Sequence, residues 1–571
     1  MFNLKKEKNN TDVFLEKRWM KYYPGDFEKI EYFNGSLYEK VKEVSERYPN
    51  YDALEYFKKK YTYKQMIEEI DKVAVAMVNT GIKENDYVTL CTANCPEAIF
   101  SFYAINKIGA IANIIHPLSS EIEIKKYLKG TNSKFLFVTD FVYNKIKHFK
   151  LKKVVILPIS NSMKFVMKNL YELTVKKDKK VKELGRNAIF WNDFIKLKKN
   201  NDIDTLVKRS KNDDAAILYS GGTTGKPKGV ILTNLCFTSI AKHCDLMVDH
   251  TDPGNSLLSY LPIFHGFGLA ICIHTPLSLG LKCILIPKIN AKKINKIVEK
   301  NKPNFLPVIP SLLEIMVRDK KASKKALASV KCVLSGGDFL NIELKNKTHK
   351  YLEEHGAKDA VIRIGYGLTE VTAATCVSLV DDYKKGSIGV PFPDTLYKIV
   401  KTNTNISADI NEIGEICISG PSVMKGYLNN QQETYKTIRI HEDGKAWLHT
   451  GDLGRMDEDG IFYFETRLKR MIISNGCNIY PNYLEEIYNK HPLIETSVIV
   501  GVHDEIKQQV AKAIIVLKKN IKLTEEVKNN ILEYAKKNIV KYALPKEYEY
   551  VDSIPKTPIG KVDYKKLENK N

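Results

Sequence analysis

Apolar and polar positions follow two different periods along most of this chain. Residues 63–78 carry apolar side chains at helical spacing, whereas FLFVTD (135–140) and AAILYS (215–220) are short runs rich in apolar residues with the length of buried strands. Helical stretches that alternate with short apolar strands are typical of α/β units built on parallel sheets. The pattern therefore predicts an α/β fold.

The pattern changes after Gly414, where the predicted strands shorten and turns such as Asp459-Gly460 separate them. The C-terminal part combines SVIVGVHD, AKAIIVLK and a helix over about residues 525–538 as a compact α+β unit. A chain of 571 residues is also too long for one hydrophobic core. We place the main boundary near Arg467, between a large domain over residues 1–466 and a small domain over residues 467–571.

Composition and charge exclude several classes of protein. With 44% apolar and 27% charged residues, the chain is globular rather than disordered. The net charge of +22 comes from lysines spread from Lys5 to Lys570 and mixed with acids. No nucleic-acid recognition motif accompanies them, so we expect a solvated lysine-rich surface and no nucleic-acid partner. The start lacks the apolar stretch of a signal peptide and no apolar run could span a bilayer, which predicts a cytoplasmic protein.

The ten cysteines show no disulfide or metal framework in the sequence. Cys91 and Cys95 are the closest pair, but no second pair or nearby histidine completes a metal site. Most cysteines lie in apolar runs, as Cys417 does in EICISG, which favours buried free thiols.

Residues 162–198 combine an apolar spacing of three and four with many lysines. One interpretation is an amphipathic surface helix that contacts anionic lipid, which would add peripheral binding at the inner face of the membrane. The other is a solvated helix packed on the domain. The sequence leaves both interpretations open.

The strongest chemical signal is a loop rich in glycine and hydroxyl groups directly after the predicted strand at 215–220. Its candidate phosphate-binding residues are Ser220, Gly221, Gly222, Thr223, Thr224, Gly225, Lys226 and Lys228. Glycines let the backbone present its N–H groups to phosphate oxygens, and the hydroxyls and lysines add donors and charge. Pro227 stands where a P-loop needs Ser or Thr, which argues against a GTPase or a kinase-type ATPase.

This loop and six further segments resemble, in the same order, the adenylate-forming superfamily of acyl-CoA synthetases, peptide-synthetase adenylation domains and firefly luciferases. The segments are LPIFHGFGL (261–269), SGGDFL (335–340), GYGLTE (365–370), WLHTGDLG (447–454), TRLKRMIISNGCNIYP (466–481) and PKTPIGKVD (555–563). The resemblance covers about residues 55–565. It implies a large N-terminal domain of two α/β sheet subdomains plus a small distorted β-barrel, followed by a small mobile α+β C-terminal lid domain.

The resemblance also implies the contacts of ATP and Mg²⁺. Tyr366 would stack on adenine beside Gly367, Thr369 would bond the α-phosphate, Glu370 would hold Mg²⁺, and Asp452 would accept both ribose hydroxyls. Further implied nucleotide contacts are Gly336, Gly337 and Asp338 at the adenine edge, and Arg467 at the end of the large domain. The family commonly has alanine at the position of Asp338, so this chain departs from the pattern there.

Three further residues are assigned by resemblance to the chemistry. Lys561 would be delivered by the small domain to stabilise charge on the α-phosphate and the attacking carboxylate. His265 would border the acyl carboxylate, with Phe264 and Phe267 shaping the entrance. Gly476 would reach the site after rotation of the small domain and open a channel for the pantetheine of coenzyme A.

These features predict activation of a carboxylic acid by ATP to acyl-AMP, release of pyrophosphate, and transfer of the acyl group to coenzyme A. The opening KRWMKYYP, the basic segment 162–198 and the run GSIGVPFP (386–393) most resemble bacterial long-chain fatty-acid–CoA ligases, so the expected acid is a fatty acid. Alternatives are a medium-chain or aromatic acid, or transfer to the phosphopantetheine of a separate carrier protein. A non-enzymatic alternative is a basic scaffold that binds membrane or nucleic acid and keeps a degenerate nucleotide fold.

Overall fold

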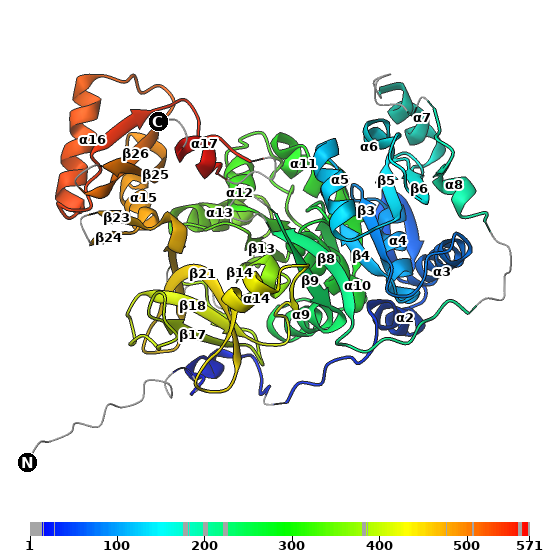
Figure 1. Ribbon diagram of the computed structural model, residues 1–571. Coiled ribbons are helices and arrows are strands. Elements are labelled where there is room, and N and C mark those ends of the chain that lie inside the picture. Colours follow the sequence, from blue (N-terminus) through cyan, green and yellow to red (C-terminus); the bar gives the residue numbers. More distant parts are fainter. Residues whose placement is uncertain are drawn as a thin grey trace, which may run out of the picture.

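The structure is a computed structural model in which four β-sheets and their covering helices are arranged around several cores (Figure 1). It describes residue 14 and residues 16–27, 29–174, 181, 183–197, 204–220, 227–379, 384, 386–474, 477–504, 507–557 and 562–568. Two large sheets, one small antiparallel sheet and a C-terminal α+β unit make up these residues. This arrangement confirms the predicted fold class.

The first large sheet contains the predicted strands 135–140 and 215–220. Its strands, in order, are β19 (Gly426–Tyr427), β9 (Lys228–Thr233), β8 (Asp214–Ser220), β4 (Ile111–Ile114), β3 (Tyr87–Cys91), β5 (Phe135–Thr139), β6 (Lys153–Leu157) and β7 (Ala188–Phe190). Neighbours from β8 to β7 run parallel, and β9 and β19 add an antiparallel edge. The helices of this part are α3 (Tyr63–Asn79), α4 (Pro96–Lys107), α5 (Glu121–Gly130), α6 (Asp140–Ile146) and α8 (Trp191–Phe194). The helical pattern at residues 63–78 thus matches α3 within one residue.

The second large sheet positions two of the predicted motifs. Its order is β16 (Val390–Pro391), β15 (Ala374–Val377), β14 (Val361–Gly367), β13 (Cys332–Gly336), β12 (Phe305–Val308), β10 (Ser256–Ser259), β11 (Lys282–Leu285), β1 (Asp52–Tyr56) and β2 (Lys59–Thr62). Its helices are α2 (Leu37–Arg47), α9 (Asn234–Met247), α10 (Thr275–Ser278), α11 (Ile294–Asn301), α12 (Pro310–Val317) and α13 (Ile342–Glu354). Because β13 and β14 are parallel neighbours, SGGDFL and GYGLTE meet at their carboxyl ends, the edge where α/β sheets bind ligands.

The third sheet is small and antiparallel, and it corresponds to the small distorted β-barrel that the resemblance implied. It orders β17 (Leu396–Val400), β18 (Gly414–Ser419), β21 (Ala446–Met456) and β20 (Ile438–Ile440), and β22 (Phe462–Arg467) pairs with the other part of β21. Helix α14 (Gln431–Thr437) precedes β20. The N-terminal turn η1 (Arg18–Tyr22) packs against this sheet. The ring of Trp19 lies edge-on to that of Phe462, with 5.6 Å between the ring centres.

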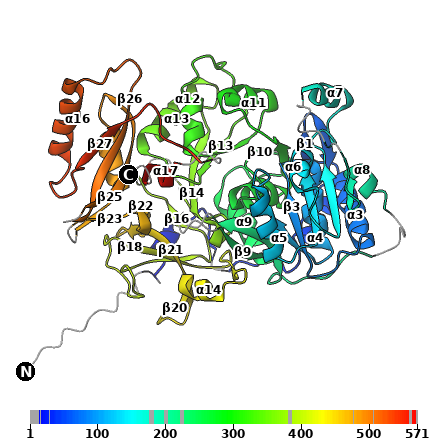
Figure 2. The same ribbon diagram turned by 45° about the horizontal axis from the view of Figure 1, so that its top comes forward.

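The C-terminal unit lies to one side of the large sheets, next to α12 and α13 in both views (Figures 1 and 2). It contains β23 (Ile472–Ser474), β24 (Cys477–Ile479), β25 (Ile494–Asp504), β26 (Gln508–Leu517), β27 (Glu547–Tyr550), α15 (Pro481–Asn489), α16 (Glu525–Asn538) and α17 (Tyr564–Glu568). Arg470 is fixed to this unit by ion pairing with Glu485 at 2.7 Å, and Arg318 of the large part pairs with Glu495 at 2.7 Å. The boundary after residue 466 and the mobility of the unit stay predictions.

Segment 162–198 does not form one amphipathic helix in its described residues. Helix α7 covers only Phe165–Thr174, and β7 and α8 follow within the same segment. The apolar spacing was mistaken for one helix because β7, which extends the first sheet, is also apolar. Helix α7 leaves Phe165 and Leu173 about four-fifths exposed, at 78% and 84%. Among the described residues, no helix has the length and apolar character to cross a membrane.

Candidate active site

The predicted phosphate loop begins and ends at two paired strand residues. Strands β8 and β9 form an antiparallel hairpin in which Ser220 lies opposite Lys228. The pairing therefore places both ends of the loop next to each other, where β8 ends and β9 begins. Eight predicted site residues lie outside the described residues: Gly221, Gly222, Thr223, Thr224, Gly225, Lys226, Gly476 and Lys561.

Lys228 and Glu370, predicted from separate motifs, are connected through Tyr427. The Lys228 ammonium pairs with Glu433 and lies 4.8 Å from the centre of the Tyr427 ring. The Tyr427 hydroxyl donates a hydrogen bond to Glu370 Oε1 at 2.9 Å. The hydrogen bond from Lys228 also holds the pKa of Glu433 below its usual value. No motif in the sequence indicates Tyr427 or Glu433, because the pairing of β19 with β9 is what brings this part of the chain to the site.

The GYGLTE segment is held by very close backbone packing. A Cβ added to Gly367 would lie 1.6 Å from the carbonyl oxygen of Ala373, and one added to Gly266 would lie 1.8 Å from that of Thr372. Thr372 is buried with a φ of 72°, a conformation that β-branched residues rarely adopt. Such strain is characteristic of functional sites. The segment that contains Thr369 and Glu370 therefore packs directly against residues 265–269 (HGFGL).

Replacing Gly367 with alanine should destabilise the protein, because the new methyl group cannot fit unless the backbone shifts. We expect a loss of about 1–3 kcal/mol, in the range of overpacked cores. Gly130→Ala is the matched control for added side-chain volume, since nothing lies within 4 Å of a Cβ there and its φ is outside the left-handed region. Urea unfolding of both variants measures the difference, and an unchanged midpoint for Gly367→Ala would contradict the packing argument.

Tyr366, Asp452 and Arg467 form a connected group at the carboxyl end of β14. The Tyr366 hydroxyl donates to Asp452 Oδ2 at 2.8 Å. Asp452 and Arg467 lie opposite each other on β21 and β22, with Arg467 Nε 3.0 Å from Asp452 Oδ1. Burial raises the pKa of the Asp452 carboxyl, and the Arg467 charge opposes that shift. The group presents a buried carboxylate next to an aromatic ring. The carboxylate can accept hydrogen bonds from the hydroxyls of a ribose, and the ring can stack on a base.

Asp338 connects the large sheets with the C-terminal unit electrostatically. It follows Gly336 and Gly337 at the end of β13, where Gly337 has a φ of 83°. Besides the larger effect of burial, the Asp338 charge contributes to raising the pKa of Tyr564, three residues after Lys561. The C-terminal residues that follow the predicted catalytic lysine therefore lie near the predicted nucleotide site.

His265 lies at the wall of an apolar cavity that contains about 930 Å³ of open space, including solvent at its mouth. Its Nδ1 accepts a hydrogen bond from the Phe267 amide at 3.2 Å, and a π-helix, η3 (Phe267–His274), follows it. Phe267 lines the cavity, whereas Phe264 packs on His116 with 4.2 Å between ring centres. Thr369, Gly367, Gly336 and Gly337 also line it, as do Cys244, Val248, Leu257, Ile271, Leu279, Leu281 and Phe305.

The structure thus brings most of the described candidates into one neighbourhood. Arg467 is close enough to both Glu370 and Asp338 for their charges to contribute to its raised pKa, after the larger effect of Asp452. Glu370 supplies the hard carboxylate oxygens that Mg²⁺ prefers, so this residue fits a magnesium ligand. The individual contacts with ATP and Mg²⁺ stay predictions.

Known proteins are similar to this chain over most of its length. The model of the AMP-binding enzyme family matches residues 41–428, and that of the AMP-binding enzyme C-terminal domain matches residues 483–561. A long-chain-fatty-acid–CoA ligase of Bacillus subtilis (strain 168) is 32% identical over 97% of this chain and 98% of its own length. The 4-coumarate–CoA ligase 1 of Solanum tuberosum is 29% identical over 89% of this chain and 88% of its own.

Solved structures show the same fold. ATP-bound MatB from Rhodopseudomonas palustris superimposes with a TM-score of 0.79 at 22% identity, covering 94% of this chain and 98% of its own. The anthranilate CoA ligase AuaEII in complex with anthranoyl-AMP gives 0.79 at 22% identity, covering 94% and 97%. Because the family model covers more than half of the residues and the Bacillus relative aligns over nearly all of them, this chain belongs to the AMP-binding enzyme family.

Proposed function

We propose that this protein is an AMP-forming acid–thiol ligase that activates a fatty acid with ATP and transfers the acyl group to coenzyme A. The observation that carries this proposal is the apolar cavity whose lining includes Thr369, Gly367 and His265. Thr369 directly precedes Glu370, so an acid bound in the cavity would place its carboxylate beside the nucleotide site. The acid and the α-phosphate can then be held in position for attack.

The chain's own residues account for the first half-reaction mainly by orientation and charge. Tyr366 and Asp452 would position the adenosine, and Thr369 and Lys228 would contact phosphate oxygens. Mg²⁺ held by Glu370 would neutralise charge on the departing pyrophosphate. Lys561, delivered by a small domain that begins at residue 467, would stabilise charge on the α-phosphate in the same step.

The choice of a fatty acid rests on the lining of the cavity and on the Bacillus relative. Apolar side chains from α9, β10, η3 and β12, and from the connection between α10 and β11, form its walls. Arg363 also lines the cavity, and its guanidinium is paired with Asp249. An aromatic acid is the second candidate, because the 4-coumarate–CoA ligases align over most of this chain.

An acid-dependent ATP–pyrophosphate exchange assay tests the proposal. A panel of saturated acids from short to long chain, together with 4-coumarate and benzoate, is offered with and without coenzyme A. Exchange and thioester formation that rise with chain length would support fatty-acid ligation, and preference for an aromatic acid would select the second candidate. Exchange without thioester formation would point to a carrier-protein acceptor, and no exchange with any acid would overturn the enzymatic proposal.

Replacing Val248 at the end of α9 with tryptophan should shorten the cavity. We expect kcat/KM for long-chain acids to fall about 10–100-fold, a penalty of about 1–3 kcal/mol for an overfilled apolar pocket, with little change for short acids. Val248→Ala is the matched control and should not discriminate against long acids. An equal loss for all chain lengths would show that Val248 does not limit the acyl chain.

Peripheral binding to anionic membrane belongs to the same proposal, and α7 is the candidate contact. We expect the protein to float with anionic vesicles at low salt, because Phe165 and Leu173 expose apolar surface beside Lys164 and Lys168. Changing Phe165 and Leu173 to aspartate should weaken binding at least about tenfold. Ile406→Asp, at a residue 62% exposed between β17 and β18, is the control. Equal flotation of all variants would remove α7 as the contact.

A further inference from the structure

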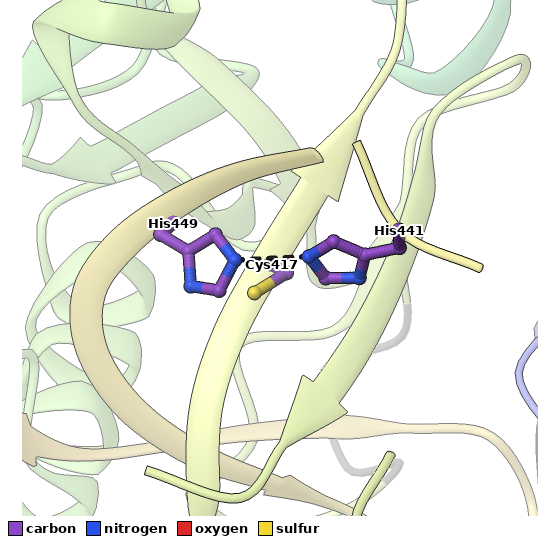
Figure 3. Close-up of side chains that lie close together, drawn as sticks. All are labelled: Cys417, His441 and His449. Carbon is purple, nitrogen blue, oxygen red and sulfur yellow. Dashed lines mark hydrogen bonds between the residues drawn. The ribbon is translucent and has the colours of Figure 1, made fainter. Parts of the chain in front are cut away.

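Three metal-binding side chains from separate segments meet inside the small antiparallel sheet (Figure 3). Cys417 lies on β18, His449 lies opposite it on β21, and His441 directly follows β20. One ligand atom from each residue lies within 4.8 Å of the others. All three residues are buried, with exposed fractions of 0%, 5% and 6% for Cys417, His441 and His449.

We propose that Cys417, His441 and His449 form a buried binding site for a divalent transition-metal ion, with zinc as the ion that fits best. A thiolate together with two imidazoles is a ligand set that suits zinc, whereas the magnesium ion proposed for the nucleotide site prefers oxygen ligands. The site is separate from the predicted contacts of Mg-ATP and does not depend on which acid the protein activates.

The hydrogen bonds of His449 orient it for this role. Glu415 Oε2 lies 2.8 Å from His449 Nδ1, so the carboxylate fixes the tautomer in which Nδ1 carries the proton. The lone pair of His449 Nε2 then points toward the cluster, where His441 Nε2 lies at 2.9 Å. A carboxylate behind a histidine is the usual support of a metal-bound imidazole.

The spacing of the two histidine nitrogens is close to that around a coordinated ion. Two imidazole nitrogens bound to tetrahedral zinc at about 2.0–2.1 Å lie about 3.3 Å apart. The two Nε2 atoms would therefore move apart by about 0.4 Å, a displacement that small side-chain rotations provide. Since the protein supplies three ligands, a water molecule would complete the tetrahedron.

The charges around the cluster also balance. Lys398 lies opposite Cys417 on β17, and its ammonium is 4.4 Å from the centre of the Trp447 ring and 3.7 Å from Asp443. Burial raises the pKa of the Cys417 thiol, and the positive charge of Lys398 opposes that shift. A bound metal would itself favour the thiolate. The carboxylates of Asp443 and Glu415 and the thiolate carry three negative charges. The Lys398 ammonium and a divalent ion carry three positive charges.

The site has a direct connection to the predicted ribose contact. Glu415 accepts from His449 through one oxygen and from the Gly451 amide, at 2.8 Å, through the other. Gly451 immediately precedes Asp452. An ion at His449 would therefore brace the turn that carries Asp452.

Metal analysis of the full-length protein tests the proposal. Protein from cells grown with added zinc should carry one zinc ion per chain by mass spectrometry, and Cys417→Ser should lose it. Cobalt added to chelator-treated protein should give thiolate-to-cobalt absorption in the wild type, and none in Cys417→Ser. His441→Asn should weaken cobalt binding at least about tenfold.

Two variants control for misfolding and for general loss of thiols or imidazoles. Cys91→Ser removes another fully buried free thiol, and His491→Gln removes a buried histidine of the C-terminal unit. Both should bind zinc and cobalt like the wild type. Zinc-free protein with no cobalt–thiolate absorption, or absorption that persists in a folded Cys417→Ser variant, would show that the cluster is only a hydrogen-bonded histidine pair beside a core thiol.

Discussion

Replacing Glu370 with glutamine should lower the rate of acid-dependent pyrophosphate release about 10²–10³-fold. Glutamine has nearly the same shape, and its amide oxygen can still accept the hydrogen bond that Tyr427 donates to Glu370. It lacks the negative charge that we propose for binding Mg²⁺ and that also acts on Arg467. A loss of this size corresponds to about 3–4 kcal/mol of transition-state stabilisation. Initial rates across a series of Mg²⁺ concentrations at saturating ATP measure it.

Tyr427→Phe separates the charge of Glu370 from its position. This variant removes the hydrogen bond to Glu370 but keeps the carboxylate and the aromatic ring under Lys228. We expect a loss of no more than about tenfold, because one hydrogen bond contributes about 1 kcal/mol. If Glu370→Gln kept the Mg²⁺ dependence and rate of the wild type, Glu370 would not be the metal ligand.

The sequence predicted the elements whose periodicity is strong and local. Helix α3 and strand β5 agree with the predicted residues 63–78 and 135–140 within one residue at each end, and α16 covers the predicted residues 525–538. Residues 162–198 were misjudged, since apolar spacing alone does not separate a helix from a helix followed by a sheet strand. Local pattern therefore determined the fold class but not this segment.

The candidate site was predictable where one motif holds several functional residues. Tyr366 to Glu370 are nearly consecutive, so a single match located them, whereas Tyr427 and Glu433 reach the site only through the pairing of β19 with β9. The same limit hid the cluster at Cys417. Its three residues are scattered along the chain, and the register of β18 against β21 is what places Cys417 opposite His449.

Replacing Asp452 with asparagine should lower kcat/KM for ATP about 10²–10³-fold. Asparagine has one acceptor oxygen in place of two and carries no charge, so the hydrogen bonds proposed from the two ribose hydroxyls would be lost or weakened. Hydrogen bonds to charged groups contribute about 1.5–3 kcal/mol each, so losing or weakening two of them gives a loss of this size. ATP-dependent pyrophosphate release at saturating acid measures the change.

The same substitution should leave the melting temperature unchanged or raise it at neutral pH, which a misfolded variant cannot do. Burial raises the pKa of the Asp452 carboxyl even against the Arg467 charge, so the folded state holds the proton more tightly than the unfolded state. The ionised carboxylate therefore costs stability as pH rises from the ordinary range of aspartate through the raised pKa. Asparagine removes that cost, and Arg467, whose side chain is 49% exposed, remains hydrated.

Asp459→Asn should change the melting temperature in the opposite direction, and it serves as the control. Hydrogen bonds from Lys21 and Lys384 lower the pKa of Asp459 to about 2, so its ionised form stabilises the folded state above the ordinary pKa of aspartate, and this stabilisation is lost as pH falls toward 2. This variant should melt slightly lower at neutral pH and keep the ATP kinetics of the wild type. Melting curves at neutral and acid pH distinguish the two carboxylates, because the advantage of Asp452→Asn should shrink once Asp452 is protonated. A lower melting temperature for Asp452→Asn at neutral pH would mean that the Asp452 carboxylate stabilises the folded state. It would contradict the argument that the buried charge costs stability.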